Sequence, residues 1–302
     1  MVKHLLNLLD IEKDQVDALL KRAKFYKKHL KQGKISKPLL GKSLGMIFEK
    51  KSTRTRVSFE VGIHQLGGQA IYLSPDQMQL GRGELVKDTA RVLSRYLDGI
   101  IVRGNSHSDL MEMAYWSSVP VINALTDLYH PCQVLSDLFT IEESGLDIRK
   151  MKLAFIGDPN NVFNDWVNAS ALIGFELRLA SPPGYKCDSS VFQLASKRGR
   201  LNLQSFHDPA LAVKGADIIY TDVWVSMGQE AEKKKRLKEF QGYQINKRLL
   251  SQAGKNALVL HCLPAHRGQE ITDEVFEEHA EMIFTQAENR LHCQKALLEF
   301  FI

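Results

Sequence analysis

Hydroxyl and guanidinium side chains cluster in the segment Ser52-Thr53-Arg54-Thr55-Arg56, directly after the apolar run 44–48. We predict that the run is a buried strand and that a helix begins inside the polar segment. A helix N-terminus offers unpaired backbone N–H groups and the positive end of the macrodipole, which favour an anion. The three hydroxyls add donors, and Arg54 adds a forked donor suited to phosphate. The segment therefore predicts a phosphate-binding site, since an ordinary capping residue would explain only one hydroxyl.

Other polar side chains follow strands in the same half of the chain. Arg103 ends the apolar run 99–103, and His130 and Gln133 flank Pro131 at the expected start of a helix. Arg290 lies near the start of the last helix, which we expect to begin at about residue 286. Ligands bind outside the carboxyl ends of parallel strands in open α/β folds. We therefore expect these side chains to share a cleft with the phosphate site.

The second half places amides and a carboxylate after strands. Gly157 is the only glycine of the turn 157–162, so the G-x-G-x-x-G pattern of dinucleotide-binding proteins is missing. Asn160 and Asn161 offer amides to a small polar ligand, although asparagine at a helix start is often a cap. Asp222 follows another predicted strand and could hold an ammonium group. These residues predict a site for a small zwitterion.

Cys262 ends a further predicted strand between His261 and the turn-forming Pro264. A cysteine nucleophile paired with His261 or His266 is one hypothesis; a buried and chemically inert thiol is the other, and it is the commoner case. Histidine, cysteine and carboxylate residues show no recurring ligand spacing, so the sequence predicts no metal site.

Short apolar runs alternate with helical patterns along the chain, which is typical of parallel sheets covered by helices on both faces. We predict a polar boundary at residues 144–150 and two doubly wound α/β domains. The polar strand ends then predict one site, between the domains, for a phosphorylated anion and a zwitterion. The predicted strands are 44–48, 70–73, 99–103, 119–122, 152–156, 176–180, 217–221, 257–261 and 282–285.

Length and composition agree with two domains of an ordinary globular protein. The 302 residues are 44% hydrophobic and carry a net charge of +5. No apolar run approaches the roughly 20 residues of a membrane span, and acidic residues interrupt the opening apolar run, so we expect no signal peptide. The four cysteines form no Cys-x-x-Cys pair. Reduced thiols and a cytoplasmic location are the resulting expectation.

Two segments are rich in basic residues. The first predicted helix, which Asp10 could cap, has a basic face between Lys21 and Lys34, and the run 230–239 holds four consecutive basic residues. Either could contact nucleic acid, but a charged face on an amphipathic helix is usually solvated. We therefore expect no nucleic-acid partner.

Five motifs resemble those of the aspartate/ornithine carbamoyltransferase family. They occur in the family's order and cover essentially the whole chain. The first two are shared by carbamoyltransferases generally, whereas the Ser-Met-Gly and His-Cys-Leu-Pro elements of the third and fourth point to the ornithine branch. Small differences from the family pattern occur at Gly104-Asn105 and at Asn164-Asp165-Trp166. The motifs are Ser-Thr-Arg-Thr-Arg at 52–56, His-Pro-Cys-Gln at 130–133, Asp-Val-Trp-x-Ser-Met-Gly at 222–228, His-Cys-Leu-Pro-x-His-Arg-Gly at 261–268 and Glu-Asn-Arg-Leu-His at 288–292.

The resemblance implies a carbamoyl phosphate-binding domain at 1–144 that the C-terminal helix 287–302 rejoins, an ornithine-binding domain at 145–286, and interdomain helices between them. It implies no cofactor. It also implies a homotrimer in which Gln79 reaches the site of a neighbouring subunit. The implied carbamoyl phosphate ligands within one chain are Ser52, Thr53, Arg54, Thr55, Arg103, His130, Pro131, Cys132, Gln133 and Arg290. The implied ornithine ligands are Asn161, Asp222, Ser226, Met227, Cys262 and Leu263.

The implied reaction is attack of the neutral δ-amine of L-ornithine on carbamoyl phosphate, giving L-citrulline and phosphate. Arg54, Thr55, Arg103, His130 and Cys262 are the implied catalytic residues. The alternatives are carbamoyl transfer to putrescine, acetylornithine or aspartate, and, from other classes, a nicotinamide-dependent oxidoreductase or an RNA-binding protein. Both directions of arginine metabolism, synthesis and citrulline breakdown, use the same site and stay open.

Overall fold

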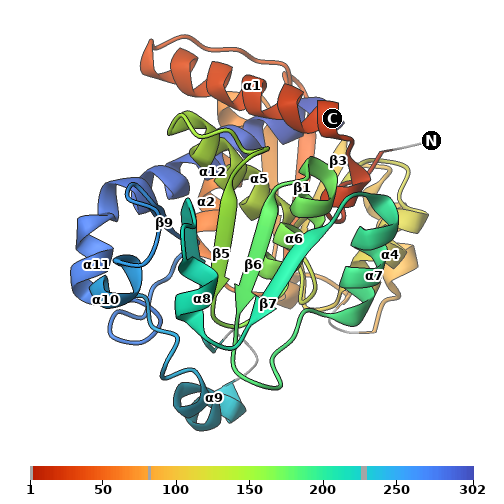
Figure 1. The fold of residues 1–302 in the computed structure, drawn as a ribbon. Coiled ribbons are helices and arrows are strands. Elements are labelled where there is room, and N and C mark those ends of the chain that lie inside the picture. The colour runs from red at the N-terminus through yellow and green to blue at the C-terminus, as the bar shows by residue number, and fades with distance from the viewer. Residues whose placement is uncertain (1–2, 81–82, 226–229) are drawn as a thin grey trace. The chain divides into compact units, whose positions relative to one another are not determined.

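The computed structural model describes residues 3–80, 83–225 and 230–302, and its contacts divide the chain into two units (Figure 1). The first unit comprises Met1–Phe139 and Asn289–Ile302, and the second comprises Thr140–Glu288. Both borders fall inside helices, α5 (Pro131–Glu143) and α12 (Ala280–Phe301). Each unit contains one parallel sheet, so the predicted α/β class with two parallel sheets is confirmed.

The sheet of the first unit has the strand order β2-β1-β3-β4. The chain moves from β1 outward to β2 and then returns to the other side of β1, so a switch point lies between β1 and β3. Nearly every residue of β1, β3 and β4 is buried, as expected for strands covered on both faces. The strands are β1 (Ser43–Phe48), β2 (Gln69–Leu73), β3 (Gly99–Arg103) and β4 (Val121–Leu125).

The second sheet has the order β7-β6-β5-β8-β9, with a switch point between β5 and β8. Because parallel crossovers are right-handed, the reversal at β5 puts α6 and α7 on one face and α8 on the other. In Figure 1, α8 runs beside β5, β6 and β7, and it packs against all three. The strands are β5 (Lys152–Ile156), β6 (Glu176–Ala180), β7 (Asn202–Phe206), β8 (Ile218–Thr221) and β9 (Leu258–His261).

The remaining elements are helices that connect or cover these strands. The helices of the first unit are α1 (Lys13–Lys31), α2 (Thr53–Gln65), α3 (Val86–Leu93) and α4 (His107–Trp116), with the short 3₁₀ turns η1 (Leu8–Asp10) and η2 (Pro75–Gln77). Those of the second are α6 (Asn161–Ile173), α7 (Ser189–Arg198), α8 (Pro209–Val213), η4 (Glu230–Glu232), α9 (Lys233–Glu239), α10 (Lys247–Leu250) and α11 (Asp273–Glu278). Within residues 3–80, 83–225 and 230–302, none of these helices has the length and apolar composition to cross a membrane.

One strand prediction was wrong, and one strand was missed. Residues 282–285 lie in α12, which begins at Ala280 and not at residue 286. Ile283, Gln286 and Arg290 are buried while Phe284 is 55% exposed, which is the spacing of a helix and not of a strand. Conversely, β7 was missed because this edge strand is mostly exposed and has no apolar run.

The start of the first helix also differs from the prediction. Asp10 does not cap α1; its carboxylate accepts hydrogen bonds from the backbone of Leu6 and Asn7 in the preceding turn, and Glu12 is the N-cap. The basic face of α1 is partly used inside the fold. Arg22 forms an ion pair with Glu299 of α12, and the buried Lys27 donates to Asn289 at 2.9 Å.

Candidate functional site

The polar segment 52–56 lies at the switch point of the first sheet, where β1 ends and α2 begins. Ser52 is the N-cap of α2, and its hydroxyl accepts the Thr55 N–H at 3.3 Å. Its oxygen therefore satisfies one of the four unpaired N–H groups of the first turn and leaves the others for a ligand. The sequence hypothesis of an anion site at a helix N-terminus thus has the required backbone geometry.

Thr55 is the point at which two distant arginines meet. Its hydroxyl oxygen accepts from Arg103 Nη1 at 3.3 Å and from Arg290 Nη2 at 3.2 Å, and Thr55 is only 2% exposed. A hydroxyl has two acceptor lone pairs and one proton. Because both lone pairs are used by guanidinium donors, the Thr55 proton is directed to a different acceptor. The arrangement holds three donor groups around one point.

Gln133 and Asp137 orient the Arg290 guanidinium from α5. Arg290 donates to Gln133 Oε1, and Gln133 Nε2 donates to Asp137 Oδ1 at 2.8 Å. Because the Asp137 carboxylate accepts the Gln133 amide NH₂, the Gln133 oxygen is left facing Arg290. Gln133 was predicted as a ligand residue, and the structure gives it this second task. Asp137 was not singled out from the sequence.

Positive charge accumulates around Thr55, because the charged groups that affect the pKa of Arg103 are themselves arginines. Burial, together with the smaller effects of the neighbouring Arg290 and Arg54, lowers the pKa of Arg103 to about 10. Arg103 nevertheless stays charged near neutral pH. Burial has the largest effect on His130 and lowers its pKa well below the ordinary value, and Arg290 and Arg103 act in the same direction. His130 is therefore neutral near neutral pH. An anion with two negative charges would relieve this repulsion.

The two arginines of the segment 52–56 differ in their surroundings. Arg56 forms an ion pair with Glu60 at 3.0 Å, and its guanidinium lies 3.7 Å from the centroid of the Tyr72 ring. These contacts on the surface of α2 account for Arg56 without a ligand. Arg54 is exposed, as is Thr53, and it is close enough to Arg103 to act on its pKa.

A tight turn after β4 presents His130 and the start of α5. Thr126 N donates to the Tyr129 oxygen at 2.9 Å, and Tyr129 N donates back to the Thr126 hydroxyl at 3.3 Å. Pro131 is the first residue of α5, where its missing N–H costs no helical hydrogen bond. Cys132 is fully buried, and its thiol contacts the Asn123 oxygen at 3.3 Å.

In the second unit, Asn160 and Asp222 meet at the switch point between β5 and β8. Asn160 Nδ2 donates to Asp222 Oδ2 at 2.6 Å, and Val223 N donates to the other carboxylate oxygen at 2.8 Å. Asn160 also caps α6, accepting from Val162 N at 3.0 Å. The capping role of Asn160 is therefore confirmed, and its amide nitrogen binds Asp222. Asn161, the residue assigned to ornithine, begins α6.

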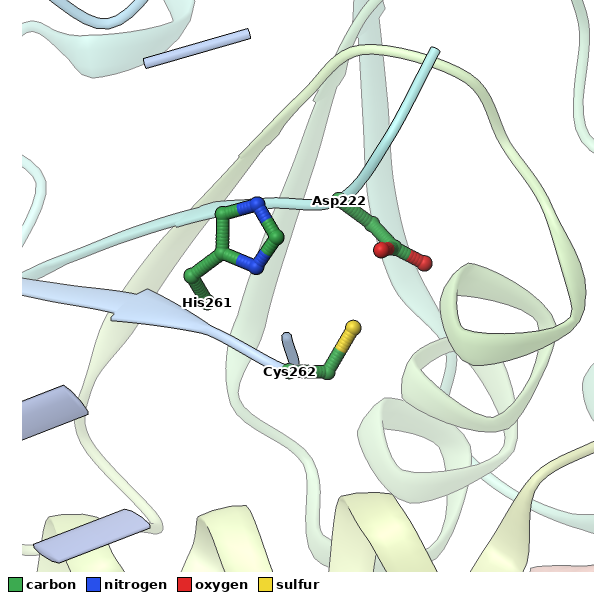
Figure 2. A group of neighbouring side chains, drawn as sticks. All are labelled: Asp222, His261 and Cys262. Carbon is green, nitrogen blue, oxygen red and sulfur yellow. The ribbon is translucent and has the colours of Figure 1, made fainter. Parts of the chain in front are cut away.

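Cys262 lies beside Asp222 and His261, as Figure 2 shows, with donor atoms of all three within 4.8 Å of one another. His261 cannot activate the thiol as the nucleophile hypothesis required. Its Nδ1 accepts the Leu263 N–H at 2.9 Å, and its Nε2 lies 3.1 Å from Glu270 Oε1. Both ring nitrogens are occupied, so His261 is a structural residue and a poor metal ligand. His266 is exposed, and its backbone N–H also donates to Glu270.

Leu263 has an unusual backbone, with φ of 59° directly before a cis peptide bond to Pro264. A branched residue in this left-handed region costs about 1–3 kcal/mol, and such conformations occur at ligand sites. The Leu263–His261 hydrogen bond and the buried Glu270 hold this conformation. The strained turn therefore directly follows the thiol at the end of β9.

Three further residues were assigned from the resemblance. Ser226 and Met227 lie outside the described residues. Gln79 is exposed after η2, and its backbone oxygen accepts from Glu84 N at 3.1 Å. The unusual triplet 164–166 is buried in α6, where the Trp166 ring packs 5.6 Å from that of Tyr220. This triplet thus contributes to the core of the second unit.

Two family models match consecutive parts of the chain. The carbamoyl-P binding domain of aspartate/ornithine carbamoyltransferase matches residues 3–143, and its Asp/Orn binding domain matches residues 149–301. The chain belongs to the aspartate/ornithine carbamoyltransferase family.

Individual members of this family match the chain over its full length. An ornithine carbamoyltransferase of Syntrophus aciditrophicus is 51% identical, with 100% of both chains covered. Among solved structures, the anabolic ornithine carbamoyltransferase of Campylobacter jejuni has a TM-score of 0.94 at 46% identity and 99% coverage of both chains. The enzyme of Pyrococcus furiosus has a TM-score of 0.93 at 46% identity, covering 98% of this chain and 96% of that one. The predicted family membership is confirmed.

Proposed function

We propose that the chain transfers the carbamoyl group of carbamoyl phosphate to the δ-amine of L-ornithine, giving L-citrulline and phosphate. The observation that supports it most is the convergence of Arg103 and Arg290 on Thr55 at the N-terminus of α2. This cluster suits a phosphorylated dianion, and relatives of about 50% identity over the full length are named ornithine carbamoyltransferase. The reaction belongs to arginine biosynthesis.

Charge develops on two groups of oxygens during the proposed reaction. The Thr55 proton, Arg103 and neutral His130 stabilise the carbonyl oxygen as it becomes anionic. Each well-placed donor contributes roughly 3 to 4 kcal/mol to such a transition state. Arg54, Arg290 and the N-terminus of α2 bind the phosphate as it leaves. A neutral imidazole at His130 donates a hydrogen bond without adding a further charge beside two arginines.

Asp222 binds the α-ammonium group of the amino acid in this proposal, and Asn160 holds the carboxylate in place. The resemblance adds Asn161, Ser226, Met227 and Leu263 to the ornithine site, with Cys262 near the δ-amine. The amine must lose its proton before it attacks, and a phosphate oxygen of the other substrate can accept it. No covalent enzyme intermediate is needed, and positioning both substrates contributes up to about 7 to 11 kcal/mol.

Assembly and location are further parts of the proposal. A homotrimer with shared active sites would use Gln79, exposed after η2, as a ligand to carbamoyl phosphate in the neighbouring subunit. The separated cysteines support a cytoplasmic setting. Sedimentation of the purified protein tests the trimer, and a monomer with full activity would contradict the sharing of sites.

A panel of amines tests the substrate. Initial rates of carbamoyl transfer are measured with ornithine, putrescine, acetylornithine and aspartate at equal carbamoyl phosphate. We expect turnover with ornithine only, because acetylornithine has the α-ammonium group blocked that Asp222 binds, and putrescine, although it keeps an ammonium at that position, lacks the α-carboxylate of ornithine. Faster transfer to any other amine would contradict the proposal.

A further inference from the structure

Arg236 lies in the Lys-rich run 230–239, which the sequence analysis interpreted as a solvated surface. That interpretation was wrong for this residue, since Arg236 is 7% exposed. Its neighbours in α9, from Lys233 to Lys235, are exposed and fit the prediction. A buried guanidinium must be paired, because leaving such a charge without partners in the interior is strongly unfavourable.

The guanidinium of Arg236 joins three separate segments of the second unit. It forms an ion pair with Asp158 at 3.0 Å, donates to the Trp224 backbone oxygen at 3.1 Å, and contacts Glu232 at 3.1 Å. Trp224 and Glu232 stand on either side, along the chain, of the segment that contains Ser226 and Met227. Arg236 thus fixes the residues that precede and follow this segment. The three contacts define what we call the Arg236 clamp.

Asp158 connects the clamp to Asp222. The Asp158 carboxylate forms the ion pair with Arg236, while the Asp158 backbone oxygen accepts a hydrogen bond from Asn160 N at 2.8 Å. Asn160 in turn donates to Asp222. Asp158 is 6% exposed, and burial raises its pKa to about 6 against the opposing effect of Arg236. Without the guanidinium, this carboxylate would lose the charge that offsets its burial.

Trp224 is held from two directions. Its ring stacks on Phe240 with 5.9 Å between centroids and 24° between planes, and its backbone oxygen is bound by Arg236. Trp224 is only two residues after Asp222. Any shift of this strand end would therefore move the carboxylate proposed to bind the substrate ammonium.

We propose that Arg236 is a positioning residue for the amino-acid substrate, acting through Asp158 and Trp224 on Asp222. This inference rests on the proposed function, in which Asp222 binds the α-ammonium group of ornithine. Arg236 itself does not touch the reacting atoms. Its loss affects ornithine binding and leaves carbamoyl phosphate binding unchanged, because the residues proposed to bind carbamoyl phosphate all belong to the first unit.

Arg178 supplies a matched control in the same unit. It is also an arginine bound to a carboxylate and to backbone oxygens: it pairs with Glu176 and donates to the Ala212 and Lys214 oxygens at 3.0 and 2.7 Å. It lies in β6 and has no contact with the Asp158 and Asp222 strand ends among the contacts of the described residues. Arg178→Gln therefore measures the loss of a structural arginine alone.

The experiment compares Arg236→Gln, Arg236→Lys and Arg178→Gln in the full-length protein. KM is measured separately for ornithine and carbamoyl phosphate, and the melting temperature is recorded for each variant. For Arg236→Gln we expect the ornithine KM to rise about 10- to 100-fold and the carbamoyl phosphate KM to change less than about twofold. Arg236→Lys restores part of the loss, since an ammonium can pair with Asp158 but cannot span all three contacts.

The outcomes separate the two proposals. Equal changes in both KM values, or a pattern identical to that of Arg178→Gln, would overturn the role of Arg236. Absence of citrulline formation by the unchanged protein would instead refute the proposed function. If Arg236→Gln does not fold, Arg236→Lys and Asp158→Asn carry the test: a selective rise in the ornithine KM supports the clamp, and its absence in both rejects it.

Discussion

Arg290 donates a hydrogen bond to the Thr55 hydroxyl at 3.2 Å although 235 residues separate them along the chain. Arg103 Nη1 binds the same oxygen at 3.3 Å from the end of β3. One small side chain therefore orders two guanidinium groups that would otherwise repel each other. In the proposed function, Thr55 therefore both donates its proton to carbamoyl phosphate and holds the two arginines of the site in place.

Thr55→Val removes the acceptor for both arginines while keeping the shape of the side chain. We expect kcat/KM for carbamoyl phosphate to fall about 10²- to 10³-fold, the effect of losing one well-placed donor to a developing oxyanion. Steady-state rates of citrulline formation measure it. Thr55→Ser, which keeps the hydroxyl, serves as the control and should retain most of the activity. A Val variant as active as the Ser variant would contradict this role.

Arg54→Ala should abolish measurable turnover and leave the fold intact, because Arg54 is exposed and its side chain is aimed at a ligand in the proposal. Arg56→Ala is the matched control two residues away, since Arg56 pairs with Glu60 and the Tyr72 ring. It should cost about 0.5 to 1 kcal/mol of stability and little activity. Circular dichroism and rates are measured on both. Near-normal activity of Arg54→Ala would count heavily against the phosphate site.

Asp222→Ala should raise the ornithine KM much more than the carbamoyl phosphate KM. The substitution removes the carboxylate that Asn160 holds at 2.6 Å and that pairs with the substrate ammonium in the proposal. Loss of such a charged partner costs about 2 to 5 kcal/mol of binding. The two KM values are measured at saturating concentrations of the other substrate. Equal effects on both would contradict the division between the two units.

The sequence predicted those parts of the site that depend on local order along the chain. The hydroxyls of 52–56 and Arg103 could be recognised because each follows an apolar strand, and parallel strands bring their carboxyl ends to one edge. The pairing of a buried guanidinium with a distant carboxylate could not be predicted. Asp158 follows β5 and Arg236 lies in α9, so only the tertiary fold brings them together. Arg236 also follows three lysines, and such a basic run predicts exposure to solvent.

Elements were misread where local pattern and tertiary environment disagree. Residues 282–285 have the composition of a strand, but the buried positions Ile283, Gln286 and Arg290 recur with helical spacing and place them in α12. The polar edge strand β7 carries too little apolar surface to be recognised. Asn160 was interpreted as a cap or as a contact to a small ligand; its oxygen caps α6, while its nitrogen binds Asp222.

His130 predicts a specific dependence of stability on pH. Burial, Arg290 and Arg103 lower its pKa in the folded protein, whereas the unfolded chain takes up a proton near the ordinary value of 6.5. The free energy of unfolding should therefore fall as the pH drops below that value, by up to about 1.4 kcal/mol per pH unit for one proton. His130→Asn removes this contribution. Urea unfolding of both proteins between about pH 5 and about pH 8 measures the difference in slope. Parallel curves would show that His130 is not held neutral.

Cys262→Ala tests whether the thiol at the end of β9 is a nucleophile. His261 is engaged by Leu263 N–H and Glu270, so it cannot take the thiol proton, and we expect turnover to fall by at most about tenfold, far less than loss of a nucleophile causes. Cys262→Ser should recover most of that loss by restoring a small polar group beside Asp222. Rates are combined with intact-mass measurement of the unchanged protein during turnover. A carbamoyl adduct on the enzyme, together with complete inactivity of both variants, would require covalent catalysis. Direct attack by the amine predicts an unmodified mass and partial activity in each variant.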